Sequence, residues 1–149
     1  MADSYTQSAG AKLSIGDSSS SPIYTVVAGI TNFGEFGRQY ERGTFNPVKD
    51  RRTRKYKGSY DEGSFTLDLA RDLTDQGQTD MMTALDSDDP VPIKIELDDA
   101  PAGSGTNPTS FKFDALVMSF TTNIGGTNDY VSAQVQIEIT SDITETAAA

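Results

Sequence analysis

Residues 130–139 read Tyr-Val-Ser-Ala-Gln-Val-Gln-Ile-Glu-Ile, which is the longest alternation of apolar and polar side chains in the chain. Successive side chains of a strand point to opposite faces of its sheet, so this alternation predicts a strand with one buried face. The residues expected to point inward are Val131, Ala133, Val135, Ile137 and Ile139, and those expected outward are Ser132, Gln134, Gln136 and Glu138. A strand that is buried on one face favours an antiparallel sandwich or barrel over a parallel sheet.

Other segments of the chain repeat this pattern. Residues 64–69, 91–97 and 111–117 alternate in the same way, and residues 23–30 are rich in β-branched side chains, so each predicts a strand. A further strand is expected at about 38–43, beyond a turn that two glycines bound. The expected fold is therefore mainly β: an antiparallel β-sandwich or partial barrel with one short flanking α-helix and a long basic inter-strand loop.

The helix is predicted where the alternation is absent, over residues 73–85. Three apolar side chains there have the spacing of one helical face and are expected to pack on the sheet. These side chains are Met81, Met82 and Leu85. Thr74 or Thr79 could cap the start of the helix, and residues 86–90 are expected to end it.

The two ends of the chain differ in composition from its middle. Residues 1–10 are small and polar, and residues 141–149 lose the hydrophobic pattern and end in three alanines. A chain of 149 residues has the length of one ordinary domain. We therefore expect a flexible N-terminal arm over 1–10, one β domain over 11–140 and a C-terminal arm over 141–149.

The composition argues against most catalytic chemistry. The chain contains neither histidine nor cysteine, so it lacks the commonest general base, the commonest metal ligands and any thiol nucleophile. We therefore predict no catalytic residue, no metal site and no cofactor. The first residues lack the basic and apolar segments of a signal peptide, and no apolar run approaches the ~18 residues that cross a bilayer. We expect a soluble protein that is made in the cytoplasm.

The basic residues are concentrated in one short segment of an acidic protein. Between Arg38 and Lys57 lie eight of the twelve Lys and Arg residues and only two acidic ones, so this segment carries +6 while the remainder carries −16. Such a segment favours docking onto an acidic protein surface, above all that of a neighbouring copy. A solvated loop and a nucleic-acid contact, with Tyr56 stacking on bases, are the alternatives.

The contact itself is expected from a loop over residues 44–58, which shows little periodicity. Hairpin loops usually have about 2–5 residues, so a loop of this length is expected to be functional. The basic residues expected to make the contact are Lys49, Arg51, Arg52, Arg54, Lys55 and Lys57.

The order of these elements resembles that of a known family. Residues 57–67 contain a glycine, then Asp-Glu-Gly, and then an alternating strand, and an Asp-Gln-Gly sequence at 75–77 opens the predicted helix. With a final strand that leads to residues 143–144, the chain resembles the major tail tube protein of the long, non-contractile tails of lambda-like bacteriophages. The resemblance covers nearly all of residues 11–145.

This resemblance implies a structural function without a catalytic set. In the family, six β-sandwich subunits close into a ring, and rings stack head to tail into a hollow tube that conducts the genome from capsid to host cell. The loop at 44–58 would reach the adjacent ring. The implied partners are copies of the chain itself and the initiator, tape-measure and terminator proteins of the tail. Genomic double-stranded DNA would pass through the lumen without specific binding, and no membrane partner is implied. The protein would be located in the virion tail tube and assembled in the host cytoplasm.

An acidic inner wall would allow the genome to slide, because it repels DNA phosphates. Several outward positions of the alternating strands carry carboxylates that are candidates for this wall. They are Asp68, Glu96, Asp114 and Glu138.

Three other functions remain open from the sequence. One is an inner-tube subunit of a contractile tail or of a type VI-like secretion system, which shares the fold. Another is a small β-sandwich module that binds a ligand through its loops. The third is a hydrolase that uses paired carboxylates, for which the 22 acidic residues offer many candidates.

Overall fold

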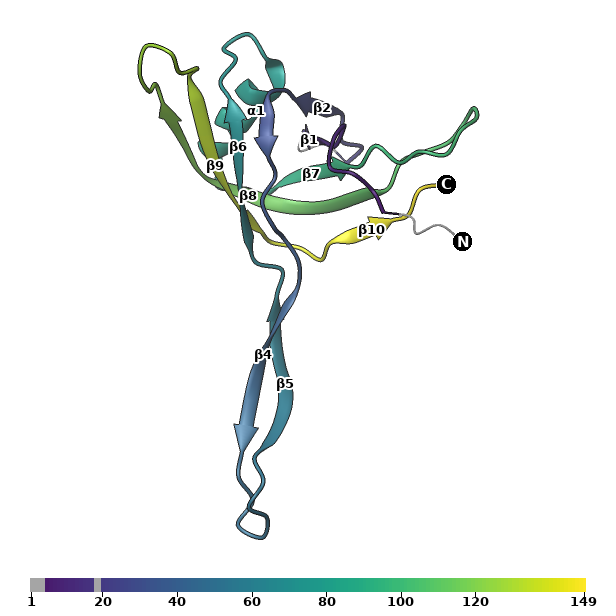
Figure 1. Cartoon of the computed structure of the whole chain (residues 1–149), viewed down its shortest axis with the longest axis vertical. Coiled ribbons are helices and arrows are strands. Elements are labelled where there is room, and N and C mark those ends of the chain that lie inside the picture. Colours follow the sequence, from purple (N-terminus) through teal and green to yellow (C-terminus); the bar gives the residue numbers. More distant parts are fainter. Residues whose placement is uncertain (1–4, 18–19) are drawn as a thin grey trace.

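The computed structural model describes residues 5–17 and 20–149. A strongly curved antiparallel sheet forms the body, and a two-stranded hairpin projects from it (Figure 1). In hydrogen-bonded order the sheet contains β2 (Tyr24–Val27), β1 (Lys12–Gly16), β7 (Val91–Glu96), β8 (Ser110–Asn123), β9 (Ser132–Ile139), β6 (Ser64–Ala70) and β3 (Ile30–Asn32), and β10 (Thr144–Thr146) pairs with β8. The prediction of a mainly β, antiparallel fold with one short helix is confirmed.

The alternation at residues 130–139 places the core as predicted. Ala133, Val135 and Ile137 are buried, and their neighbours Gln134 and Gln136 are exposed. Val131 is an exception, because it precedes β9 and is 38% exposed. Strands β6, β7 and β8 contribute buried side chains in the same alternating way. Burial of each large aliphatic side chain stabilises the fold by about 1.5–3 kcal/mol.

The predicted strand at 23–30 is two strands at opposite edges of the sheet. β2 pairs with β1, whereas β3 pairs with β6. The chain changes direction at Gly29, whose φ of 81° favours glycine, and the Gly29 carbonyl accepts a hydrogen bond of 2.7 Å from the Ala70 amide. The continuous β-branched run therefore predicted strand structure correctly. It could not reveal that the chain passes from one edge strand of the sheet to the other within this run.

The helix α1 (Gln76–Leu85) begins later than predicted, and neither predicted threonine caps it. Its N-cap is Asp75, whose Oδ2 accepts hydrogen bonds from the amides of Gln78 at 3.0 Å and Ala28 at 3.1 Å. One carboxylate thus caps the helix and ties it to the β2–β3 connection. An acidic cap followed three residues later by a glutamine is a signal of a helix start that the sequence does contain.

The predicted packing face of α1 is only partly correct. Met81 and Ala84 are buried and Leu85 is half-buried, but Met82 is 40% exposed. The helix packs against β8, β2 and β1. Gly77 allows this close approach, because a Cβ atom there would overlap the carbonyl oxygen of Val26.

Most of the segment predicted as a long loop, residues 44–58, belongs to a hairpin. The predicted extent of the loop is therefore wrong. β4 (Gln39–Phe45) pairs with β5 (Arg54–Asp61), and only residues 46–53 connect them. Both strands are exposed along their length, so they lack the apolar alternation from which a strand is recognised. Cross-strand aromatic pairs stabilise the hairpin instead. The ring centroids of Tyr40 and Tyr60 lie 5.4 Å apart, and those of Phe45 and Tyr56 lie 6.4 Å apart.

Candidate assembly surface

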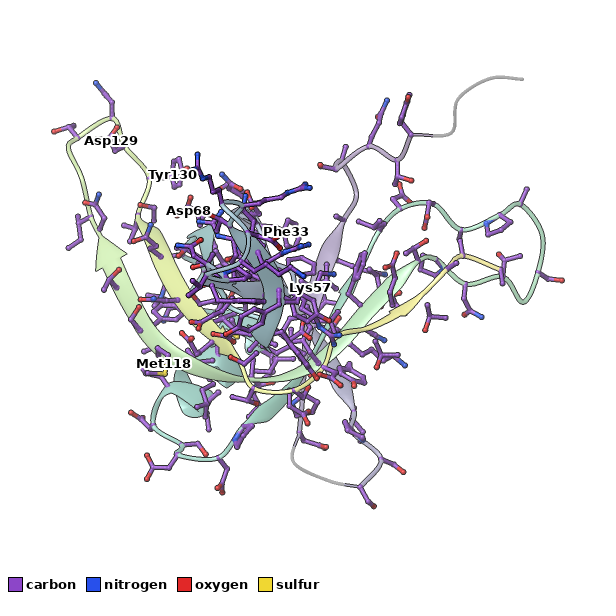
Figure 2. All side chains as sticks on the ribbon, turned by 90° about the horizontal axis from the view of Figure 1, so that it is seen from below. Phe33, Lys57, Asp68, Met118, Asp129 and Tyr130 are labelled. Carbon is purple, nitrogen blue, oxygen red and sulfur yellow. The ribbon has the colours of Figure 1, made fainter. Side chains whose placement is uncertain are left out.

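The hairpin carries all six basic residues that are expected to make the contact. Lys49, Arg51 and Arg52 lie in its turn, and the other three lie on β5. All six are exposed, and the hairpin extends away from the body (Figure 1). Figure 2 looks at the molecule from below and labels Lys57 on this hairpin. The structure therefore brings the predicted contact residues together on one projecting element.

The register of the hairpin separates a basic side from an aromatic side. Arg42 lies opposite Lys57 and Thr44 opposite Lys55, so three cations share one side. Phe45 lies opposite Arg54 on the other side, which also holds Tyr56. Like charges directly opposite each other destabilise a strand pair. A partner that supplies carboxylates to the basic side would remove this repulsion.

A cluster of charges fixes the root of the hairpin. Arg38 Nε lies 2.7 Å from the Glu62 carboxylate, which is only 7% exposed, and Arg38 Nη2 lies 3.3 Å from Asp142. The guanidinium stacks on Tyr60 at 4.1 Å. Hydrogen bonds to the side chains of Tyr40 and Glu62 hold the pKa of Arg38 above its usual value, so Arg38 keeps its charge. One arginine thus links the hairpin to the body and to the segment before β10.

We expect Arg38→Met to lower the free energy of unfolding, because it leaves the Glu62 carboxylate buried without its cation. Urea denaturation measures this loss. In the double variant, Arg38→Met with Glu62→Gln, the buried charge is also removed, so the loss should be smaller than in Arg38→Met alone. Equal losses in the two variants would show that the ion pair does not fix this root.

The four candidate wall carboxylates lie on one face of the sheet, opposite the core. Each neighbours a buried residue along its strand, as Asp68 does between Leu67 and Leu69. Three lysines share this face, namely Lys12, Lys94 and Lys112. Lys94 Nζ lies 3.2 Å from Glu96, so part of the acidic charge is neutralised locally. The face is therefore less acidic than the carboxylates alone would make it.

The β7–β8 loop and the end of the chain form a second cluster. The Thr109 hydroxyl and amide donate to the Asp99 carboxylate at 2.5 and 2.7 Å, and the Ala148 amide donates to the same hydroxyl at 3.1 Å. Asn107 and Ala149 exchange two backbone hydrogen bonds. The hydroxyl and amide of Thr109 hold the pKa of Asp99 below its usual value.

This lowered pKa predicts a response to acid. The Asp99 contribution is present above the unfolded-state value of about 3.9 and is lost as pH falls from there through the lower folded-state pKa. We expect the exchange protection of the Ala148 and Ala149 amides to fall over this range, as hydrogen exchange can measure. Thr109→Val should remove the protection already at neutral pH. Protection that persists in acid would contradict this role of Asp99.

The described part of the chain holds no group of three or more acidic side chains placed to bind a metal ion. No helix in that part is long and apolar enough to span a membrane.

No family model and no curated protein matches the sequence. Solved structures do match. A chain from the six-fold symmetrised baseplate of the anti-feeding prophage aligns with a TM-score of 0.73 and 12% identity, over 99% of this chain and 98% of that one. A chain from the sheath/tube terminator of an extracellular contractile injection system has a TM-score of 0.71 and 14% identity, over 99% and 100% of the two chains. The SPP1 tail tube has a TM-score of 0.68 and 10% identity, over 92% and 76%. The chain therefore has the fold of tail tube proteins.

Proposed function

We propose that this chain is the non-enzymatic structural subunit of a phage-type tail tube, in which six-membered rings stack head to tail around a channel for the genome. The observation that carries this proposal is the fold, which matches assembled tail proteins over nearly the whole chain. Within such a tail the partners would be further copies of the chain and the initiator, tape-measure and terminator proteins.

The projecting hairpin supports a role in assembly. A two-stranded hairpin alone is at best marginally stable in water, and β4 and β5 pair with no other strand of the described chain. Its exposed side chains include the large apolar or aromatic residues Phe45, Val48 and Tyr56. Their exposure to water does not stabilise a monomer, whereas a contact with another subunit would bury them. A neighbouring ring would cover these side chains and order the hairpin.

The sheet edges support ring closure. The path of the main sheet ends in β2 on one side and in the short β3 on the other, and open edges of this kind are prone to pair with other chains. Pairing with a neighbouring copy would cover such an edge. Contacts between unlike surfaces then stack without limit, as a tube requires.

The open face of the sheet would line the channel. Asp68, Glu96, Asp114 and Glu138 would repel DNA phosphates there, and the lysines on the same face would moderate this repulsion. The wall that we propose is therefore weakly acidic and would let the genome slide.

A second candidate is the inner tube of a contractile system. One of the three structures comes from an extracellular contractile injection system, and its TM-score of 0.71 is slightly higher than the 0.68 of the SPP1 tail tube. The lambda-like, non-contractile tail remains our first proposal because of the motifs at residues 57–67 and 75–77. Binding of a sheath protein to the assembled tube would favour the contractile system.

The mass of the protein in solution tests the proposal. We expect light scattering of a concentration series to show species of six times the 16.0 kDa protomer and larger multiples of that ring. A mass that stays at one protomer up to the highest concentration would count against a tube subunit and favour the ligand-binding module.

A further inference from the structure

A groove of about 500 Å³ lies between α1 and the strands β1 and β2. Its apolar lining is formed by Ile15, Ile23, Ala84 and Val91. Asp80, in α1, and Ser87, just beyond the end of α1, also line it. Ile23 is 73% exposed, so the chain leaves part of this apolar surface uncovered.

The groove lies in the most acidic part of the molecule. Residues 72–89 contain six carboxylates and no basic side chain. Asp80 lines the groove, while Asp86 and Asp88 flank Ser87 and are exposed. A partner for this site should therefore combine a small apolar anchor with several cations.

The tip of the hairpin, residues 46–53 between β4 and β5, combines an apolar side chain with several cations. Val48 is fully exposed at the turn, which is closed by a hydrogen bond of 3.1 Å from the Asp50 amide to the Pro47 carbonyl. Asp50 is the one acidic residue of the tip, and it pairs with Arg54 at 2.8 Å. Among the described residues no ion pair involves the remaining cations of the tip, which are Lys49, Arg51 and Arg52.

The hairpin tip and the groove cannot meet within one copy. Figure 1 shows α1 and the hairpin tip at opposite ends of the long axis of the molecule. A second copy displaced along this axis brings them together. We infer that the hairpin tip of one subunit docks in the groove beside α1 of a subunit in the next ring, with Val48 against the apolar lining. Lys49, Arg51 and Arg52 then face Asp80, Asp86 and Asp88. This inference rests on the proposed tube and names the receiving surface.

Disulfide crosslinking tests this contact directly, because the chain has no cysteine of its own. We expect the full chain with Val48→Cys and Ser87→Cys to form a ladder of linked copies under mild oxidation. The matched control carries Val48→Cys and Ser104→Cys, whose second position is exposed but lies in the β7–β8 loop. The control should form no such ladder. Equal crosslinking of both proteins, or a ladder in the control alone, would overturn the inference.

Charge reversal gives a second test, which needs no covalent link between the copies. The groove-reversed variant carries Asp86→Lys, Asp88→Lys and Asp89→Lys, which are exposed positions at the C-terminal end of α1, where lysine is compatible with the helix dipole. The hairpin-reversed variant carries Arg51→Glu, Arg52→Glu and Arg54→Glu. Each variant alone should lose at least tenfold in stacking, measured by sedimentation. Their equal mixture should recover stacking, because each contact between the two different variants joins opposite charges.

The groove contact and the tube can be disproved separately. If the wild-type chain forms tubes but the groove-reversed variant also forms them normally, the inferred groove is wrong and the tube proposal stands. If the wild-type chain does not stack and the variant with Val48→Cys and Ser87→Cys does not crosslink, both the groove contact and the tube proposal are wrong. Recovery of stacking in the mixture of the two variants supports both the groove contact and the tube proposal.

Discussion

The hairpin-reversed variant should remain folded and should fail to stack into tubes. Arg51→Glu, Arg52→Glu and Arg54→Glu change the charge of each hairpin by six units, at exposed positions that contribute nothing to the core. Like charges brought together at an interface cost several kcal/mol, and each subunit of a ring would bear that cost. We expect tubes to disappear in electron micrographs, while circular dichroism and the thermal midpoint stay close to the wild-type values.

The matched control keeps the charges and changes the side chains. Arg51→Lys, Arg52→Lys and Arg54→Lys should stack nearly as well as the wild type, because the positive charge is retained. High salt should weaken wild-type stacking, since the screening length falls to about 3 Å at 1 M. Normal tubes from the hairpin-reversed variant would show that electrostatic docking by the hairpin is wrong.

Gln78→Leu is expected to cause the largest loss of stability. Gln78 is fully buried, and its amide oxygen accepts hydrogen bonds of 2.9 Å from Arg71 Nη1 and from the Asp72 amide. Its amide nitrogen donates to the carbonyls of Ala28 at 2.8 Å and Ala70 at 2.9 Å. Leucine fills a similar volume but leaves these groups without their partner, at about 1–3 kcal/mol for each one that water does not reach.

We expect a total loss of about 4 kcal/mol and a fall in the thermal midpoint of about 10 °C for a domain of this size. Gln76→Leu is the control, because Gln76 is exposed in the same helix and bonds only to Asp80 among the described residues. It should change stability by less than about 0.5 kcal/mol. A loss below about 1 kcal/mol in Gln78→Leu would contradict the structural role assigned to this amide.

The body of the fold could be predicted because its strands are buried on one face. Residues 64–69 and 130–139 show this alternation clearly, and β6 and β9 lie beside each other in the sheet. The short strands β1 and β10 were not predicted, because they have only five and three residues. Their placement depends on pairing with distant strands, which no local pattern records.

The candidate surface could be predicted in composition but not in shape. The charge pattern identified the basic residues of the hairpin, yet both faces of β4 and β5 are solvated, so no alternation revealed the strands. The aromatic residues Tyr40, Phe45, Tyr56 and Tyr60, which pair across the hairpin, are a signal that could have done so. The link between Arg38 and Glu62 joins residues 24 positions apart and depends on the tertiary fold.

The central claim is that copies of this chain assemble into a hollow tube, and negative-stain electron microscopy of the concentrated wild-type protein tests it most directly. We expect six-membered rings seen end-on and stacked, hollow tubes seen from the side. Particles of single 16.0 kDa subunits without rings or tubes at any concentration would contradict it.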